Sequence, residues 1–294
     1  MNKQRIALVT DSCADIPAAL LKKYPIYVIP LKIRFGDNEY LDGVTIQPSE
    51  IYRRQKDELP RTSLPDGALI EDTFRRIRAD GYEKVLAVHL SAGLSGTYNM
   101  VRVMGSDFVG LEVAAFDSGS GSLGIGLTVL QLARYIEEGR TWTELLHAAP
   151  KLIRNTKVFF CVDTLEFLQK GGRIGRITAV AGTLLQIKPI LTFAPDGQLV
   201  NVAKVRGRKL AMDKMVHMVQ EYEPGSGRYT IAVAHGDTPE ECRQIKEAVQ
   251  HALPAYESCF EGEIDCTLAS YVGPHLLGVG IQTLQDDLFS EPET

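Results

Sequence analysis

The amino-acid sequence predicts an α/β fold of two domains, for three reasons. Its first half alternates short apolar runs with helical patterns, which is typical of a mainly parallel, Rossmann-like sheet flanked by helices. Its second half has the turn sequence Pro195-Asp196-Gly197 between two apolar runs, which predicts a hairpin and hence a mixed sheet. Its length of 294 residues suits two domains. We expect an N-terminal domain over residues 1–156, a C-terminal domain over 157–285 and an acidic tail over 286–294.

Strands and helices follow one another in the predicted N-terminal domain. Most of its strands stop at a hydroxyl-rich turn that opens a helix. Because ligands of open α/β sheets bind beyond the carboxyl ends of the strands, these turns are where we expect a site. The predicted strands cover residues 6–9, 27–33, 84–90 and 111–116, and the predicted helices begin near Asp15, at Asp66 and after Thr97, and cover 124–138 and 143–154.

The predicted C-terminal domain is built around the hairpin. A helical stretch is expected to end at residue 187, and the acidic tail is expected to be frayed. The predicted strands cover residues 158–162, 189–193, 199–205, 229–234 and 257–268 with a final apolar run at 279–284, and the predicted helices cover 208–222 and 239–252.

Composition excludes some classes of function. A net charge of −5 argues against a nucleic-acid-binding protein, which normally has a basic excess. No run approaches 18 apolar residues, so we expect no membrane span, and the N-terminus lacks the apolar length of a signal peptide. The five cysteines include no C-x-x-C pair and no two histidines have metal-ligand spacing. We therefore expect reduced thiols in a cytoplasmic protein, and no metal site.

The segment Gly119–Gly124 has the pattern G-x-G-x-x-G between a strand and a helix, so a nucleotide site must be considered. A dinucleotide site also needs an acidic residue about 20 positions later, at the end of the next strand. Glu137 and Glu138 instead close the predicted helix. The alternative interpretation is that small residues let this helix pack closely against a bulky neighbour.

Two short segments place hydroxyl groups before predicted helices. Ser95 lies in G-L-S-G-T, one residue short of the nucleophile pattern G-x-S-x-G. It is consistent with a helix cap, with an anion site at a helix N-terminus, or with the nucleophile of a serine hydrolase. Thr62 and Ser63 precede the helix that Asp66 is expected to cap, and alone they indicate no more than loop chemistry.

Two groups of basic residues stand out in an otherwise acidic protein. If the hairpin brings them together, they form a patch suited to phosphate or to an acidic partner, and otherwise they are a solvated face. The first group is Lys170, Arg173 and Arg176, and the second is Lys204, Arg206, Arg208 and Lys209.

Seven segments together resemble, in order and spacing, the DegV family of bacterial fatty-acid-binding proteins. They span nearly the whole chain, from about residue 6 to residue 284, and are specific only as a set. The segments read L-V-T-D-S-C-A-D-I-P, V-I-P-L-K-I, R-T-S-L-P, L-S-A-G-L-S-G-T-Y-N, L-Q-K-G-G-R-I, K-V-R-G-R-K and V-G-P-H-L-L-G.

The resemblance implies a long-chain fatty acid in an apolar tunnel between the two domains, and no covalent chemistry or cofactor of the chain's own. Thr62 and Ser95 would hydrogen-bond the carboxylate, with Ser63 and Gly96 of the same two motifs as further carboxylate-binding residues. The family usually has a histidine where Tyr271 stands, a small glycine where His275 stands and a threonine where Cys13 stands. Tyr271 can donate one hydrogen bond to a carboxylate, and His275 is a candidate for the missing imidazole.

The resemblance also implies a protein partner. Some members of the family present the fatty-acid carboxylate to a dihydroxyacetone-kinase-like fatty acid kinase, which converts it to an acyl phosphate. Arg173 and Arg206 would then serve partner docking or the transferred phosphate. Exchange of the lipid would need only transient membrane contact.

Overall fold

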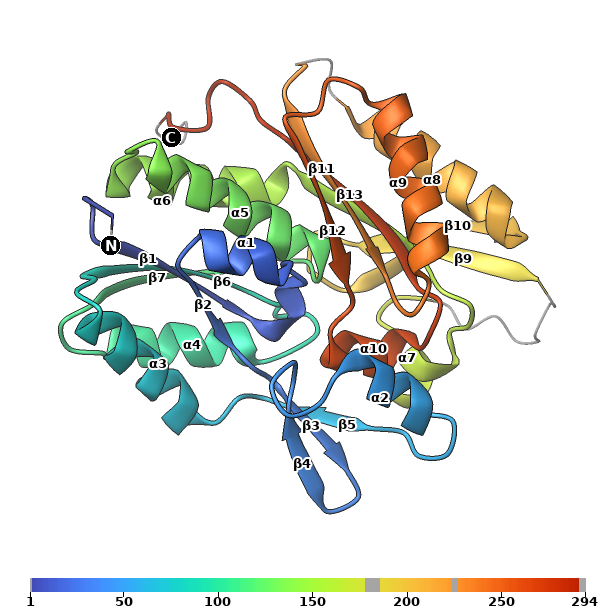
Figure 1. Ribbon diagram of the computed structural model, residues 1–294, viewed down its shortest axis with the longest axis horizontal. Coiled ribbons are helices and arrows are strands. Elements are labelled where there is room, and N and C mark those ends of the chain that lie inside the picture. Colours follow the sequence, from blue (N-terminus) through green and yellow to red (C-terminus); the bar gives the residue numbers. More distant parts are fainter. Residues whose placement is uncertain (1, 178–185, 224–226, 291–294) are drawn as a thin grey trace.

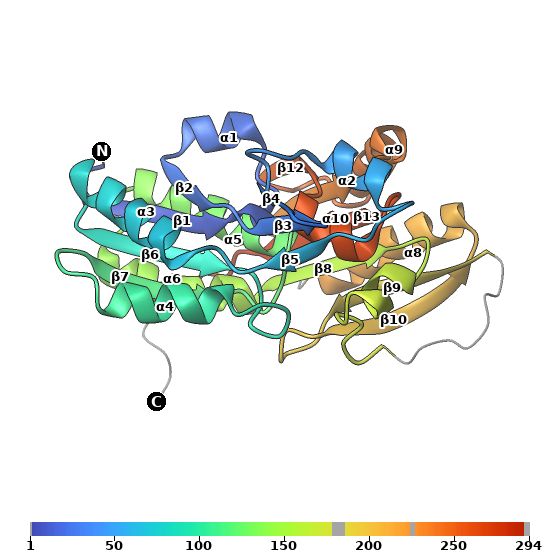
Figure 2. The ribbon, with the colours of Figure 1, turned by 90° about the horizontal axis from the view of Figure 1, so that it is seen from below.

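The computed structural model describes residues 2–177, 186–223 and 227–290. It confirms the predicted α/β fold, with a parallel sheet built by the first half of the chain and a mixed sheet built by the second (Figure 1). A small antiparallel sheet lies next to both. The hairpin of β9 (Ile187–Phe193) and β10 (Leu199–Arg206) lies with α8 (Arg208–Tyr222) at one end of the molecule. Helices α3 (Gly67–Ala79) and α4 (Thr97–Ser106) lie at the opposite end (Figure 2).

The parallel sheet has the strand order β2-β1-β6-β7. Its central strands, β1 and β6, are almost entirely buried apolar runs, as expected for strands covered by helices on both faces. Helices α3 and α4 cover one face and α5 the other. The elements are β1 (Ile6–Asp11), the 3-10 helix η1 (Ser12–Ala14), α1 (Ala18–Lys23), β2 (Ile26–Ile29), α3 (Gly67–Ala79), β6 (Lys84–His89), α4 (Thr97–Ser106), β7 (Glu112–Asp117), α5 (Leu123–Glu137) and α6 (Trp142–Arg154).

The small sheet is an insertion between β2 and α3. It has the antiparallel order β4-β3-β5, and α10 from the far end of the chain packs against β3 and β5. Its strands are β3 (Lys32–Phe35), β4 (Asn38–Leu41) and β5 (Arg61–Ser63), with α2 (Pro48–Arg54) between the last two.

The mixed sheet has the order β10-β9-β8-β13-β11-β12, in which only β11 and β12 pair in parallel. Helices α8 and α9 cover one face, and α5 covers the other. The elements are β8 (Thr156–Cys161), α7 (Glu166–Lys170), β9 (Ile187–Phe193), β10 (Leu199–Arg206), α8 (Arg208–Tyr222), β11 (Tyr229–His235), α9 (Pro239–Ala252), β12 (Ser258–Glu263), α10 (Cys266–Val272) and β13 (Leu277–Thr283).

Helix α5 joins the two halves of the molecule. It packs against β1 and β6 of the parallel sheet and against β8, β11 and β13 of the mixed sheet. A helix enclosed in this way is apolar on nearly every side, and almost all of α5 is buried. One large apolar cluster therefore extends through both sheets. The predicted domain boundary, residue 156, is the first residue of β8.

The structure corrects four of the sequence predictions. The strand predicted over 27–33 is two strands, β2 and β3, which belong to different sheets and are separated by Pro30. The strand predicted over 257–268 ends at Glu263, because Asp265 caps α10. The helix predicted near Asp15 is preceded by η1, and Asp15 itself has left-handed backbone angles. Most of the helix predicted up to residue 187 lies outside the described residues.

The fourth correction concerns the acidic tail, of which residues 286–290 are described. This part is docked and not frayed. Leu288 is buried, and the ring of Phe289 packs edge-on against Tyr135 with their centroids 4.9 Å apart. The Lys151 ammonium donates to the carbonyl oxygens of Asp287 (2.5 Å) and Ser290 (3.0 Å). Within the described residues, no helix is long and apolar enough to cross a bilayer.

Candidate functional site

A cavity of about 370 Å³ lies between the two halves of the molecule. Its volume falls within the usual range for small-molecule sites. Both halves contribute to the wall, with Leu31, Leu90 and Leu123 from the first and Phe160 and Leu276 from the second. A ligand in this cavity would therefore contact both halves at once.

Most of the cavity wall is apolar, although Ser122 and Thr267 also line it. Leu90, Leu123, Phe160 and Leu199 are all buried, and Phe193 packs against Phe160 with the ring centroids 6.0 Å apart. The position of Gly121 is constrained by the same wall, because a Cβ there would lie 3.2 Å from Leu90 and 3.5 Å from Phe193. A polar group that entered this region would lose its hydration without gaining hydrogen bonds.

Polar groups line the part of the cavity nearest the solvent. Thr62, Ser95 and Tyr271 are half-buried there, whereas Ser63 and Gly96 are exposed. All five were singled out from the sequence, and the fold brings them to one cavity. The Thr62 and Tyr271 hydroxyls share a hydrogen bond, which links β5 to α10. The cavity thus combines an apolar interior with a hydroxyl-lined mouth.

The position of Thr62 is set by the small sheet. Thr62 pairs with Ile33 in the neighbouring strand, and the Ile33 side chain is fully buried. Beyond β5, Asp66 occupies the capping position of α3, but its carboxylate pairs with Lys32 at 2.6 Å instead of capping the helix amides. Both contacts fix β5 against β3, which holds the hydroxyl of Thr62 at the cavity.

The position of Tyr271 is set by α10 and by a glycine. Asp265 caps the helix by accepting a hydrogen bond from the Leu268 amide at 3.0 Å. Gly171 lies against the tyrosine ring, where an added Cβ would come within 2.4 Å of a ring carbon. The ring therefore occupies a slot that only glycine leaves open.

Ser95 lies in the turn between β6 and α4. Its hydroxyl shares a hydrogen bond with the Thr97 hydroxyl at 2.9 Å and accepts one from the Thr97 amide at 3.3 Å. The turn is tied to the β9–β10 hairpin, because the Ser91 hydroxyl donates to the carbonyl oxygen of Gly197 at 2.9 Å. Gly93 fits closely there, since a Cβ would lie 2.8 Å from the backbone of Asp196.

Arg173 is the only charged residue among the described residues that line this cavity. Its guanidinium lies 5.1 Å from the centre of the Tyr271 ring, within the range of a cation–π contact. It donates to the carbonyl oxygens of Gly171 at 3.1 Å and Leu94 at 3.4 Å. The side chain is exposed, so it places a positive charge at the mouth.

The fold leaves His275 and Arg206 outside the lining of this cavity. The His275 imidazole pairs with the Asp163 carboxylate at 2.9 Å, and its side chain is half exposed. Arg206 is an exposed residue at the end of β10. The segment that carries Arg173 contacts the other end of this strand, where the Arg176 amide bonds the Leu199 carbonyl oxygen at 3.0 Å. Seven residues of strand span roughly 23 Å, so β10 holds Arg206 far from Arg176.

The fold also bears on the two enzyme alternatives. Gly119–Gly124 leads into the buried helix α5, and Gly126 in that helix approaches the chain so closely that a Cβ would lie 2.6 Å from the Ala14 carbonyl oxygen. This matches the interpretation of small residues as close packing. Among the described residues, no imidazole is hydrogen-bonded to Ser95, and the buried His89 instead bonds Asp11 at 3.0 Å.

Comparison with known proteins identifies the family. The family model described as "Uncharacterised protein, DegV family" matches residues 5–284. A DegV domain-containing protein of Clostridium acetobutylicum is 35% identical over 278 residues, which is 95% of this chain and 99% of the relative. This chain belongs to the DegV family.

Solved structures of DegV proteins share the fold. A fatty-acid-binding DegV family protein from Thermus thermophilus is 30% identical, with a TM-score of 0.88 over 97% of this chain and all of that one. DegV from Bacillus subtilis, described as a fatty-acid-binding protein, is 29% identical with a TM-score of 0.85 over 97% of this chain and all of that one. A stearic-acid-binding protein of Eubacterium ventriosum is 26% identical with a TM-score of 0.86, over 94% of this chain and 97% of that one.

The apolar wall of the cavity was missed by sequence reasoning. Residues such as Leu123, Phe160, Phe193 and Leu268 look like ordinary core residues in the sequence, because a buried strand or helix gives the same pattern whether it faces protein or a cavity. The small residues of Gly119–Gly124 were the local indication, since Gly121 and Ser122 line the cavity.

Proposed function

We propose that this DegV protein binds a long-chain fatty acid, with the acyl chain in the apolar cavity and the carboxylate at its hydroxyl-lined mouth. The observation that supports the proposal is the polarity of the cavity: buried leucine and phenylalanine side chains inside, and the hydroxyls of Thr62, Ser95 and Tyr271 outside. Relatives with the same fold are described as binding fatty acids, stearic acid among them.

Burial of the acyl chain would supply most of the affinity. Each methylene group moved out of water contributes about 0.8 kcal/mol, so a 16-carbon chain gains on the order of 10 kcal/mol before the cost of ordering it. The hydroxyls would add direction more than strength, because they hold the carboxylate at the mouth and exclude the reversed orientation.

The carboxylate needs hydrogen-bond donors, since it loses part of its water at the mouth. Ser95 and the hydrogen-bonded pair of Thr62 and Tyr271 supply hydroxyl protons, one of which is engaged between Thr62 and Tyr271 in the structure. Ser63 and the Gly96 amide lie at the same mouth as further donors. His275 and Arg206 have no part in this arrangement, because neither lines the cavity.

Lipid extraction tests the proposal directly. The purified protein is extracted with organic solvent, and the extract is analysed by mass spectrometry before and after loading with oleate or palmitate. We expect about one fatty acid per chain. A protein that carries no lipid and takes up none from solution would refute the proposal.

We further propose that the exposed mouth presents the carboxylate to a fatty acid kinase, with Arg173 as the contact. The kinase would transfer the terminal phosphoryl group of ATP to a carboxylate oxygen, which yields an acyl phosphate and ADP, so this chain would do no covalent chemistry itself. Arg173 is exposed beside the mouth, where a partner could reach it.

The kinase proposal is tested with a dihydroxyacetone-kinase-like fatty acid kinase and oleate-loaded protein. We expect Arg173→Ala to retain the fatty acid and to lose acyl-phosphate formation, and Arg206→Ala, with its charge far from the mouth, to keep both. Wild-type turnover with Arg173→Ala would refute the role of Arg173.

A further inference from the structure

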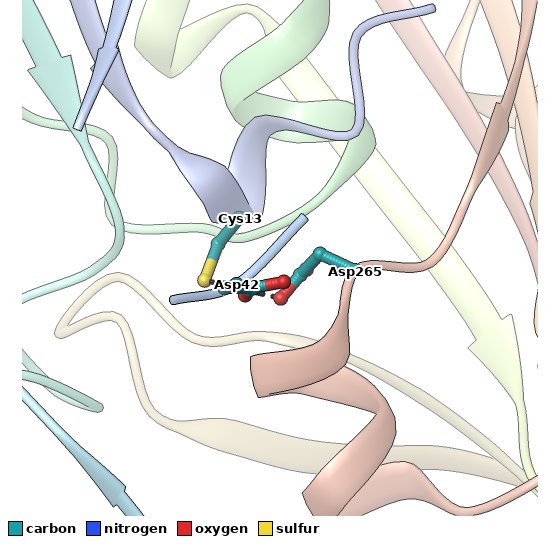
Figure 3. A group of neighbouring side chains, drawn as sticks. All are labelled: Cys13, Asp42 and Asp265. Carbon is teal, nitrogen blue, oxygen red and sulfur yellow. Dashed lines mark hydrogen bonds between the residues drawn. The ribbon is translucent and has the colours of Figure 1, made fainter. Parts of the chain in front are cut away.

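A second polar site lies at the first turn of α10. It consists of Cys13 from η1, Asp42 from the residue after β4, and Asp265 from the cap of α10 (Figure 3). One ligand atom of each lies within 4.8 Å of the others, and all three residues are buried. The figure shows the thiol and the two carboxylates directed toward one another.

Both carboxylate oxygens of Asp42 accept hydrogen bonds, whereas one carboxylate oxygen of Asp265 has none from the residues that the structure describes. The Asp42 carboxylate accepts from the Cys266 amide at 2.9 Å and from the Thr267 amide and hydroxyl at 3.0 and 2.6 Å. Asp265 Oδ1 accepts from the Leu268 amide at 3.0 Å and from the Cys13 thiol at 3.6 Å, whereas its Oδ2 is buried and has no hydrogen-bond partner among the described residues. The same holds for Oδ2 of Asp15, beside it in the fold. Asp265 and Asp15 are only 8% and 7% exposed.

The cluster gathers acidic groups without a basic partner in the described part of the chain. Within the described residues, no lysine or arginine forms an ion pair with Asp15, Asp42 or Asp265. A buried group of this kind is stable only when protons or a bound cation balance its charge.

A second cavity reaches the two carboxylates of the cluster, although Cys13 is not part of its lining. Its volume is about 650 Å³, and its lining includes Asp15, Asp42 and Asp265 together with the exposed Glu263. Asp11 and Glu261 also line it, and there is no lysine or arginine among the described lining residues. A cleft lined by one sign of charge concentrates ions of the opposite sign, so this cavity attracts cations.

We propose that Cys13, Asp42 and Asp265 bind a divalent metal ion of the zinc class. A sulfur and an oxygen bound to the same tetrahedral zinc lie roughly 3.6 Å apart, given their usual bond lengths. The Cys13 sulfur and Asp265 Oδ1 are 3.6 Å apart. Binding would release the thiol proton, since the thiolate is the ligand.

The thiol selects the class of metal. Magnesium and calcium prefer ligand sets made only of oxygen, whereas thiolate sulfur favours zinc and cobalt(II), the usual spectroscopic substitute. The ion would join η1 and the Asp42 turn to the first residues of α10, the helix that holds Tyr271 at the lipid cavity. None of Cys13, Asp42 and Asp265 lines the lipid cavity, so the metal proposal does not rest on the proposed lipid function.

The test is a titration of chelator-treated, full-length protein with cobalt(II), followed by absorption. We expect one equivalent to produce a thiolate-to-cobalt charge-transfer band in the near ultraviolet, and zinc to displace it. Cys13→Ser should abolish the band and Asp265→Asn should weaken cobalt binding at least tenfold. Cys242→Ser is the matched control. The Cys242 thiol is also buried, but among the apolar side chains between the mixed sheet and helices α8 and α9, so this change should leave the band unchanged.

The proposal is overturned if the wild-type protein shows no band at one equivalent, because the carboxyls then share protons instead. It is also overturned if the band survives Cys13→Ser and disappears in Cys242→Ser. X-ray absorption of the zinc-loaded wild type needs no variant: we expect one sulfur at about 2.3 Å with oxygen ligands, and a shell without sulfur would contradict the site.

Discussion

At the scale of single residues, three hydroxyl groups from distant parts of the chain define the mouth of the lipid cavity. Their side-chain types suggested little alone: Ser95 was consistent with a cap, an anion site or a nucleophile, and Thr62 with a loop. The ordered set of seven motifs supplied the roles that we propose for them. The contact between Thr62 and Tyr271 could not be predicted, since it depends on how β5 meets α10.

His275 shows the limit of transferring a motif by position. It was a candidate for the imidazole that Tyr271 replaces, being only four residues away in the sequence. The turn after α10 directs it elsewhere, because Gly273 and His275 both have positive φ, at 71° and 65°. The imidazole reaches Asp163 and not the cavity.

Thr62→Val tests the carboxylate site at constant side-chain volume. A hydrogen bond to a charged group contributes about 1.5–3 kcal/mol, so we expect fatty-acid affinity to fall roughly 10- to 150-fold. Displacement of a fluorescent fatty acid measures this. Ser106→Ala, which removes an exposed hydroxyl far from the cavity, is the control and should bind normally. Equal affinity of Thr62→Val and wild type would place the carboxylate elsewhere.

Gly171→Ala tests the slot for Tyr271. The added methyl would lie 2.4 Å from the ring, so the ring must move and take its hydroxyl away from Thr62. We expect at least a tenfold loss of fatty-acid affinity, measured by the same displacement. Gly67→Ala is the control and should not change affinity, because its added methyl would lie at an ordinary 3.6 Å from the nearest atom. Wild-type affinity in Gly171→Ala would show that the position of the tyrosine is not needed for binding.

At the scale of elements, α10 is the clearest departure from the sequence prediction. Its first residues were assigned to a strand over 257–268, because alternating apolar residues continue past Glu263. The chain leaves the sheet there since Asp265 caps a helix and Asp42, more than 200 residues earlier, accepts its first amides. Long-range capping of this kind has no local pattern, whereas the β9–β10 hairpin, with its local Pro195-Asp196-Gly197 turn, was predicted correctly.

Thr267→Val tests the anchoring of α10. It removes the 2.6 Å hydrogen bond to the buried Asp42 carboxylate, so we expect the free energy of unfolding to fall by about 1.5–3 kcal/mol. Urea denaturation measures the loss, and Thr267→Ser should recover most of it. Thr141→Ala, which removes the capping box of the distant α6, should cost about 1 kcal/mol and spare lipid binding. An unchanged stability of Thr267→Val would mean that the bond to Asp42 does not anchor the helix.

At the scale of the whole molecule, α5 explains why the two halves enclose a cavity. The predicted fold class and the succession of strands along the chain followed from local apolar patterns. The burial of α5 between two sheets depends on contacts between distant parts of the chain. The cluster of Cys13, Asp42 and Asp265 has the same origin. The sequence predicts no metal site, because Cys13 and Asp265 are 252 residues apart and come together only in the fold.

Because both halves contact the cavity and share one apolar cluster, a bound fatty acid should stabilise the protein as one unit. A ligand at 100 times its Kd adds about 2.7 kcal/mol to the free energy of unfolding. We therefore expect saturating oleate to raise the midpoint of a single calorimetric transition. Two transitions, with only one shifted by oleate, would contradict this coupling.

A crystal structure of the oleate-loaded protein tests the lipid site most directly. We expect the carboxylate within hydrogen-bonding distance of the Thr62 and Ser95 hydroxyls and the acyl chain along Leu123, Phe160 and Phe193. A carboxylate in the apolar interior, or an acyl chain in the acidic second cavity, would contradict the proposed function.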